Sequence, residues 1–171
     1  MTIHVIGAGL LILAGGLFAK NKTAALKSNL TMLASLASSL QVMLSEIQVN
    51  LTPIGEILEM LSAFGAPCSR RFFQEVSDQF TAQGAPYLEQ CWNTAVDRCC
   101  AGLSDEEQRA MRTLGEVLGR YGVDEECAAI SRCVSELNTG HTQLRRRYSA
   151  DVRLYTGLGL TAGCILAIVL L

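Results

Sequence analysis

Apolar residues recur every three or four positions in two long stretches of the chain, one toward each end. The first stretch consists of Leu26, Leu30, Leu33, Ala37, Leu40, Leu44, Ile47 and Leu51. The second consists of Cys127, Ile130, Val134, Leu137, His141, Leu144 and Tyr148. Because spacings of three and four place residues on one side of an α-helix, the pattern predicts two long amphipathic helices. Their apolar seams could pair if the two helices run in opposite directions.

Helix start and stop signals divide the region between these two stretches. Thr52-Pro53 supplies a capping hydroxyl and a first-turn proline, which predicts a helix that runs to about Phe64. Gly65-Ala66-Pro67 ends it, and two further helices are expected at about 69–83 and 86–100.

A fifth helix is marked by a capping box, in which Ser104 is followed three residues later by Glu107. We expect Gly122 to end this helix and Asp124 to cap the last one. The fifth helix carries one apolar side: Met111, Leu114, Val117, Leu118 and Tyr121. No segment shows the alternation of a strand. The predicted fold class is therefore all-α, an antiparallel bundle of about six helices.

Both ends of the chain are apolar. Residues 3–19 are apolar apart from His4, and residues 154–171 contain no charged side chain. As helices, these segments would be about 25 Å long, at the short end for crossing a bilayer. We expect transmembrane helices at 1–19 and 154–171, continuous with the first and last helices of a bundle at 20–153.

The distribution of charge predicts the orientation of these anchors. No basic residue precedes the first apolar run, which argues against a signal peptide. Basic residues lie instead on the bundle side of both runs, at Lys20, Lys22, Lys27, Arg145, Arg146, Arg147 and Arg153. By the positive-inside rule the bundle is cytoplasmic, and these side chains would face anionic lipid.

The body of the bundle is acidic. Residues 28–144 hold fifteen acidic side chains and seven basic ones. An acidic body disfavours nucleic acid as a partner and favours a basic protein.

Catalytic motifs are scarce. Gly7-Ala8-Gly9 resembles the start of a dinucleotide-binding turn, but the third glycine and the acidic ribose ligand are missing, so an oxidoreductase is a weak interpretation. The chain has only two histidines, and His141 falls on a helix seam. We find no phosphate-binding loop and no metalloprotease or serine-hydrolase motif. We therefore expect no enzyme activity and no cofactor.

Seven cysteines leave one alternative open. Their odd number and the absence of a CxxC pair are typical of free thiols in a reducing compartment. Cys91, Cys99 and Cys100 could bind zinc, although their spacing is not that of a structural site. A membrane-anchored helical sensor or adaptor that uses cysteines for redox or metal sensing is the alternative to an assembly protein.

Three segments together resemble one family. They are "EIQVNLTPIGEIL" (46–58), "LGEVLGRYGVD" (114–124) and "YTGLGLTAGCILAIVLL" (155–171). In this order they resemble stage III sporulation protein AB, a family similar to the cytoplasmic module of the type II secretion F platform proteins. The family tends to carry a glutamine shortly after the aspartate, where this chain has Cys127 and Ala128.

The resemblance implies a function and a location. The chain would be a non-enzymatic platform or assembly subunit of the channel complex that links mother cell and forespore during endospore formation. It would lie in the mother-cell membrane around the forespore, with its helical domain in the mother-cell cytoplasm. Implied partners are the stage III AA ATPase and other stage III A channel subunits. Copies of the chain could also form a homo-oligomer.

The resemblance also implies an architectural role for six matched residues. They are Thr52, Pro53, Leu114, Gly115, Leu118 and Gly119. A glycine inside a helix destabilises it by roughly 1 kcal/mol relative to alanine, and close packing against another helix commonly offsets this. We therefore expect Gly115 and Gly119 to lie where helices approach closely.

Overall fold

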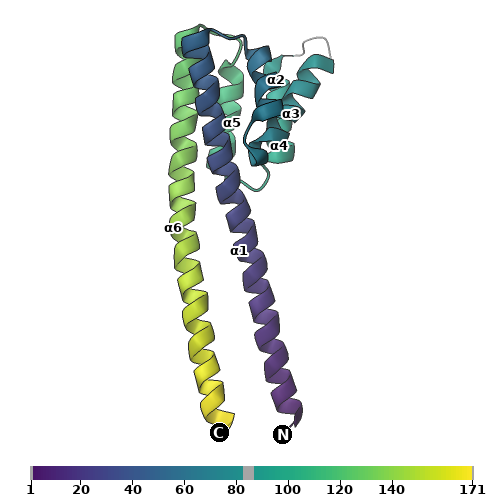
Figure 1. The fold of residues 1–171 in the computed structure, drawn as a ribbon, viewed down its shortest axis with the longest axis vertical. Helices are drawn as coiled ribbons and strands as arrows, with labels where there is room; N and C mark the ends of the chain where they lie inside the picture. The colour runs from purple at the N-terminus through teal and green to yellow at the C-terminus, as the bar shows by residue number, and fades with distance from the viewer. Residues whose placement is uncertain (1, 83–86, 171) are drawn as a thin grey trace. The chain divides into compact units, whose positions relative to one another are not determined.

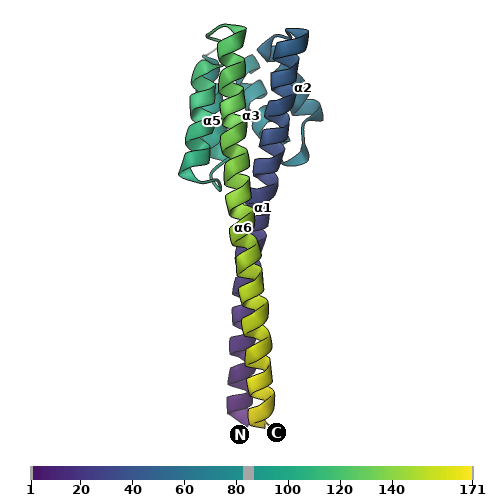
Figure 2. The same ribbon diagram turned by 90° about the vertical axis from the view of Figure 1, so that its left-hand side faces the viewer.

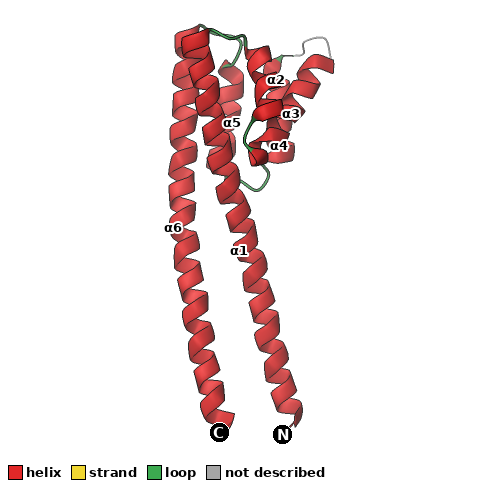
Figure 3. Ribbon diagram, in the orientation of Figure 1, coloured by secondary structure: helices red, strands yellow, loops and turns green. Residues whose placement is uncertain are grey.

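The computed structural model describes the backbone of residues 2–82 and 87–170, and the side chains of residues 24–81 and 87–149. Within the described backbone there are six α-helices and no strand (Figure 3). A short π-helix, η1, directly follows the first of them. The elements are α1 (Thr2–Ser45), η1 (Glu46–Asn50), α2 (Ile54–Phe64), α3 (Pro67–Ala82), α4 (Leu88–Cys99), α5 (Asp105–Val117) and α6 (Val123–Leu170). The predicted all-α class is confirmed.

The chain divides into two compact units. One contains residues 31–142, and therefore the end of α1, all of α2 to α5 and the beginning of α6 (Figure 1). The other contains residues 1–30 and 143–171.

The capping box predicted at the start of α5 is confirmed. The Ser104 hydroxyl accepts a hydrogen bond from the backbone N–H of Glu107, at 3.4 Å. The Glu107 carboxylate in turn accepts one from the backbone N–H of Ser104, at 2.8 Å. Both bonds satisfy donors that the first helical turn leaves without partners.

The start of α2 is where the sequence predicts it, but the predicted cap is wrong. No side-chain hydrogen bond caps this helix, and Pro53 occupies the N-cap position. The Thr52 hydroxyl instead donates to the carboxylate of Glu46, at 3.0 Å. Thr52 therefore stabilises the turn that precedes α2 and does not cap the helix.

Aromatic side chains from two helices form the centre of the core. Phe72 and Phe73 of α3 and Trp92 of α4 are fully buried. Phe72 packs edge-on against both Phe73 and Trp92, with ring centroids 5.1 and 4.9 Å apart. Edge-to-face contacts of this kind add to the stability that burial of the aromatic area supplies.

Both predicted long seams contribute to the same core. On the first, Leu33, Ala37, Leu40 and Ile47 are buried; on the second, Cys127, Ile130, Val134 and Leu137 are buried. Leu51 was predicted to continue the first seam, which is wrong: helix η1 ends at Asn50, and Leu51 is 69 % exposed. Tyr121, predicted on the apolar side of the fifth helix, lies beyond the end of α5 and is exposed.

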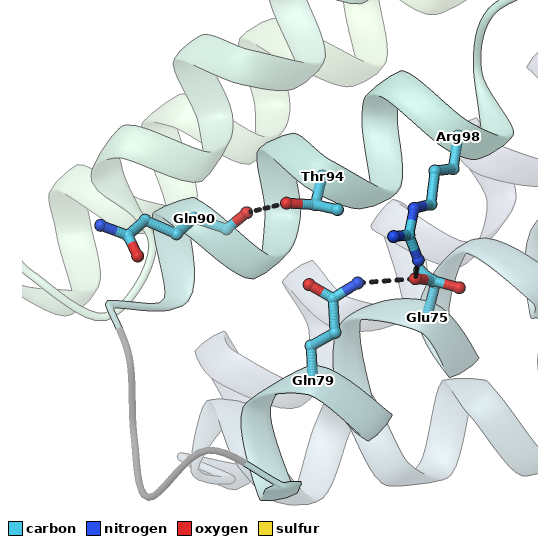
Figure 4. A network of polar contacts seen from close by, with 5 residues as sticks. All are labelled: Glu75, Gln79, Gln90, Thr94 and Arg98. Carbon is cyan, nitrogen blue, oxygen red and sulfur yellow. Dashed lines mark hydrogen bonds and ion pairs between the residues drawn. The ribbon is translucent and has the colours of Figure 1, made fainter.

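Polar side chains tie α3 to α4 along the rim of the core (Figure 4). The Glu75 carboxylate pairs with the guanidinium of Arg98 and accepts a hydrogen bond from the amide of Gln79, at 2.6 Å. On α4 itself, the Thr94 hydroxyl donates to the backbone carbonyl of Gln90. Because the Arg98 side chain is mostly exposed, solvent screens its ion pair, and the pair adds little to stability.

Among the described side chains, one segment, Ala24–Asn50, is long and apolar enough to cross a membrane by length and composition alone. Core helices of soluble proteins pass the same test. Part of this segment is core in the 31–142 unit, because Leu33, Leu36 and Leu40 are fully buried there. The two predicted spans, 1–19 and 154–171, lie outside the residues whose side chains are described.

Candidate interaction surface

Several helix ends meet at one end of the 31–142 unit. The end of α1 with η1, the start of α2, the end of α5 and the start of α6 lie side by side there (Figures 1 and 2). We call residues 46–54, 87–89 and 118–127 the loop end. Two of the three segments that carry the family resemblance, 46–58 and 114–124, contribute to it. The fold therefore brings together two motifs that are far apart in the sequence.

Gly119 connects three parts of the loop end. Its φ of +77° lies in the left-handed region that favours glycine, and its backbone N–H donates to the Glu126 carboxylate at 2.8 Å. A Cβ at this position would lie 3.6 Å from Leu88 and 3.9 Å from Ile54, which is ordinary contact. The prediction that Gly119 lies inside a helix is wrong, because α5 ends at Val117.

Glu126 is a buried carboxylate, with 7 % of its surface exposed. Its bond to the Gly119 N–H and its position in the first turn of α6, near the positive end of the helix dipole, offset part of the desolvation of its charge. The hydrogen bond between Gly119 and Glu126 therefore fixes the conformation of the segment that connects α5 to α6.

A further ion pair connects α4 to the segment after α5. The Arg120 guanidinium lies 3.0 Å from the Glu89 carboxylate and 5.7 Å above the ring centre of Tyr87. Both contacts are partly exposed, so each contributes on the order of 1 kcal/mol or less. Their main effect is to hold the start of α4 beside the end of α5.

Exposed apolar side chains gather at the loop end. The large side chains here that are at least 44 % exposed are Val49, Leu51, Tyr87, Tyr121 and Val123. Acidic residues accompany them: these segments contain Glu46, Glu89, Asp124, Glu125 and Glu126, against the single basic residue Arg120. Exposed apolar groups rimmed by charge are typical of a surface that binds another protein.

Of the other architectural residues, Thr52, Pro53 and Leu118 fall within the loop end, and Leu114 and Gly115 lie outside it. Leu114 and Leu118 are buried, and Gly115 packs against Trp92: a Cβ on Gly115 would lie 2.5 Å from Cδ1 of the indole ring. The Trp92 indole N–H donates to the backbone carbonyl of Met111, at 2.7 Å. The structure therefore places Gly115 where α4 and α5 approach closely. Sequence reasoning did not identify Trp92 as the residue that Gly115 accommodates.

The predicted basic residues belong to the other unit. Lys27, Arg145, Arg146 and Arg147 are exposed and fall within residues 1–30 and 143–171. Lys20, Lys22 and Arg153 lie outside the described side chains. Contact of these residues with anionic lipid stays a prediction.

Five of the six described thiols, all but the exposed Cys68, suit packing better than sensing. Burial raises the pKa of Cys100 to about 12, and that of Cys133 likewise to about 12. Burial also raises the pKa of Cys91, Cys99 and Cys127. A protonated thiol is a poor nucleophile and a poor metal ligand. Within residues 24–81 and 87–149, no group of three or more His, Cys, Asp or Glu side chains is arranged to hold a metal ion.

The fold and this surface define a class: an all-helical protein whose exposed apolar side chains gather where several helix ends meet. The family model described as stage III sporulation protein AB matches residues 4–171, and the chain belongs to this family. Its role is therefore in sporulation. A solved structure of a stage III sporulation protein AB is similar in fold, with a TM-score of 0.59 and 19 % sequence identity. The alignment covers 68 % of this chain and 92 % of that one. No curated protein gives a match.

Proposed function

We propose that this protein is a non-enzymatic platform subunit of the channel complex between mother cell and forespore, and that its loop end docks the stage III AA ATPase. Family membership supports the sporulation setting. The observation that carries the docking proposal is the cluster of exposed apolar side chains among acidic ones at the loop end. Such a surface complements a basic partner with an apolar patch.

The proposal includes the membrane arrangement. In it, α1 and α6 run antiparallel, residues 1–19 and 154–171 span the mother-cell membrane, and residues 20–153 lie in the cytoplasm. The uncharged termini and the basic residues beside them support this arrangement. The likeness to type II secretion F platforms belongs to the same proposal, as does contact with other stage III A subunits.

Docking can be tested with the full-length chain in nanodiscs and the purified ATPase. Neutralising Asp124 and Glu125 as Asn and Gln should weaken binding several-fold, and binding of the unmodified chain should weaken as salt rises. The matched control is Asp105→Asn with Glu106→Gln. Those two carboxylates also lie in a first helical turn, but about 18 Å from the far end of α5.

The control separates docking from helix stability, because both pairs lose the same interaction with a helix dipole. If the two double variants bind the ATPase equally well, the loop end is not the contact. An affinity that does not change with salt would remove the electrostatic part of the proposal.

Membrane orientation can be tested by labelling Cys68, the only exposed thiol among the six described cysteines. In cells that carry the protein in the plasma membrane, a membrane-permeant maleimide should label it and an impermeant one should not. A Cys68→Ser variant identifies the background from other thiols. Labelling of Cys68 by the impermeant reagent would reverse the proposed orientation.

A further inference from the structure

Leu51 adopts a backbone conformation that leucine rarely adopts. Its φ of +52° and ψ of +33° lie in the left-handed region, and it is the only non-glycine residue with positive φ within the described backbone. The clash between Cβ and the backbone disfavours this region for branched and bulky residues. The side chain is also 69 % exposed, so burial within the chain does not offset the strain.

Glu46 holds this conformation from both its backbone and its side chain. Its carbonyl accepts the backbone N–H groups of Leu51 and Thr52, the second at 3.2 Å. Its carboxylate accepts hydrogen bonds from the Asn50 amide, at 2.8 Å, and from the Thr52 hydroxyl, at 3.0 Å. Four donors that follow Glu46 thus converge on one residue, and the turn is fixed around it.

The helix that leads into this turn is itself unusual. Glu46–Asn50 forms a π-helix, a rare element that occurs mostly as a single turn and often at functional sites. It leaves Val49 74 % exposed, two residues before Leu51. Backbone strain of this kind persists where the surrounding structure enforces it, as Glu46 does here, and it is common at binding sites.

Acidic side chains flank the same turn. Burial raises the pKa of the Cys127 thiol in α6, a hydrogen bond with the Gln48 side chain of η1 lowers it, and the charge of Asp124 raises it. Asp124 and Glu125 are both exposed. Helix η1 therefore lies next to the start of α6, whose first turn carries these two exposed carboxylates.

We propose that Leu51, with Val49, is the hydrophobic anchor of the loop end, and that Glu46 is the positioning residue that presents it. The occupant is a protein with an apolar socket bordered by basic side chains, chosen by complementarity to the apolar and acidic groups described above. This inference rests on the proposed function and names the residues through which docking occurs.

The test separates the shape of the turn from the side chain it presents. Asparagine adopts the left-handed conformation more readily than leucine, so Leu51→Asn keeps the turn and removes the apolar group. The variant should melt at the same temperature as the unmodified full-length chain in nanodiscs, or higher. Its affinity for the purified ATPase should fall about tenfold, as for a buried anchor residue.

The control is Phe64→Ser, which removes an exposed apolar side chain at the far end of α2, about 15 Å along the helix. It should leave the affinity unchanged. Glu46→Ala should weaken binding like Leu51→Asn, and the double variant should bind no more weakly than Leu51→Asn alone. That non-additivity is expected of a residue that acts through Leu51 and not of a general loss of stability.

Counts of heat-resistant spores distinguish failure of this inference from failure of the proposed function. If the ATPase does not bind the unmodified chain but Leu51→Asn lowers the spore count and Phe64→Ser does not, the anchor stands and the partner is another protein. If the ATPase binds both forms equally and spore counts are unchanged, Leu51 is not an anchor and the inference is overturned. A lower melting temperature for Leu51→Asn would also overturn it, because Leu51 would then stabilise the fold itself.

Discussion

Gly115 lies against the indole ring of Trp92 so closely that a methyl group on Gly115 would be 2.5 Å from Cδ1 and 2.8 Å from Cγ. Both residues are buried, and the ring is held in place by its hydrogen bond to Met111. The ring therefore has little room to move away. The absence of a side chain at Gly115 determines how closely α4 and α5 pack.

Gly115→Ala should destabilise the protein. Overpacking a buried contact lowers the free energy of unfolding by about 1–3 kcal/mol, more than the helix propensity of alanine restores. The matched control is Gly55→Ala in α2, where the new methyl would lie 3.7 Å from Phe80. That variant should be equally stable or more stable. Chemical unfolding of the detergent-solubilised chain, followed by circular dichroism, measures both; equal stabilities would contradict the packing argument.

Gly119→Ala should destabilise for a different reason. The added methyl has ordinary space, but alanine disfavours the left-handed backbone of this position. The free energy of unfolding should therefore fall by about 1–2 kcal/mol. Gly122→Ala is the control, because Gly122 has no positive φ and its nearest neighbour, at 2.8 Å, is the flexible end of Glu125. If Gly122→Ala is the more damaging change, the turn after α5 differs from the one described.

Gly140→Ala should disrupt the capping box of α5 from a neighbouring helix. A methyl on Gly140 would overlap the Glu107 carboxylate and lie 3.0 Å from its Cδ atom. The displaced carboxylate would lose its bond to the Ser104 N–H, which lowers stability by about 1 kcal/mol.

The effect should reverse sign when Glu107 is absent. In a Glu107→Ala background, Gly140→Ala should stabilise by up to about 1 kcal/mol, because alanine favours the helix and nothing is displaced. A double-mutant cycle measured by thermal unfolding gives the coupling. Additive effects would show that Gly140 and the cap are independent.

Stability should fall as the pH rises above 9. The pKa of Cys133 is raised from 9.0 to about 12 in the folded state, so the unfolded chain releases this proton at lower pH than the folded one. The stability that the protonated Cys133 thiol contributes is complete below pH 9 and is lost as the pH rises toward 12. Over that window the free energy of unfolding should fall by up to about 1.4 kcal/mol per pH unit. The difference between the unmodified chain and Cys133→Ala isolates this thiol, and parallel pH profiles would contradict the shift.

Local signals in the sequence were sufficient to predict where the helices begin. Capping residues, prolines and glycines act within one helical turn, so Ser104, Glu107 and Pro53 identify helix starts without any knowledge of the tertiary structure. The seams were predicted for the same reason, because periodicity is a property of one segment.

Other features depend on contacts that the hydrophobic pattern does not encode. The three-and-four spacing continues through Leu51, so nothing in the pattern indicates that Glu46 would draw the chain into a π-helix and a left-handed turn. Gly119 and Gly122 are both plausible helix ends; the structure distinguishes them by the positive φ of Gly119 and by the hydrogen bond that its N–H donates to Glu126. Trp92 is separated from Gly115 by an entire loop, and a single sequence does not show which residue fills the space that a glycine leaves.

The loop end was partly predictable. The resemblance drew attention to residues 46–58 and 114–124, and the structure brings parts of both segments to one end of the unit. Which side chains would be exposed there was not predictable, since Leu51 and Tyr121 both fit the apolar seams.

The chain contains one tryptophan, and its position makes it an intrinsic fluorophore at the contact of α4 with α5. An indole shielded from water and bonded to a carbonyl emits at shorter wavelength than a solvated one. Its emission spectrum can therefore follow loosening of this contact without any added dye. Because the indole is not part of the loop end, a spectral change on addition of a partner would indicate that docking is transmitted to the interior.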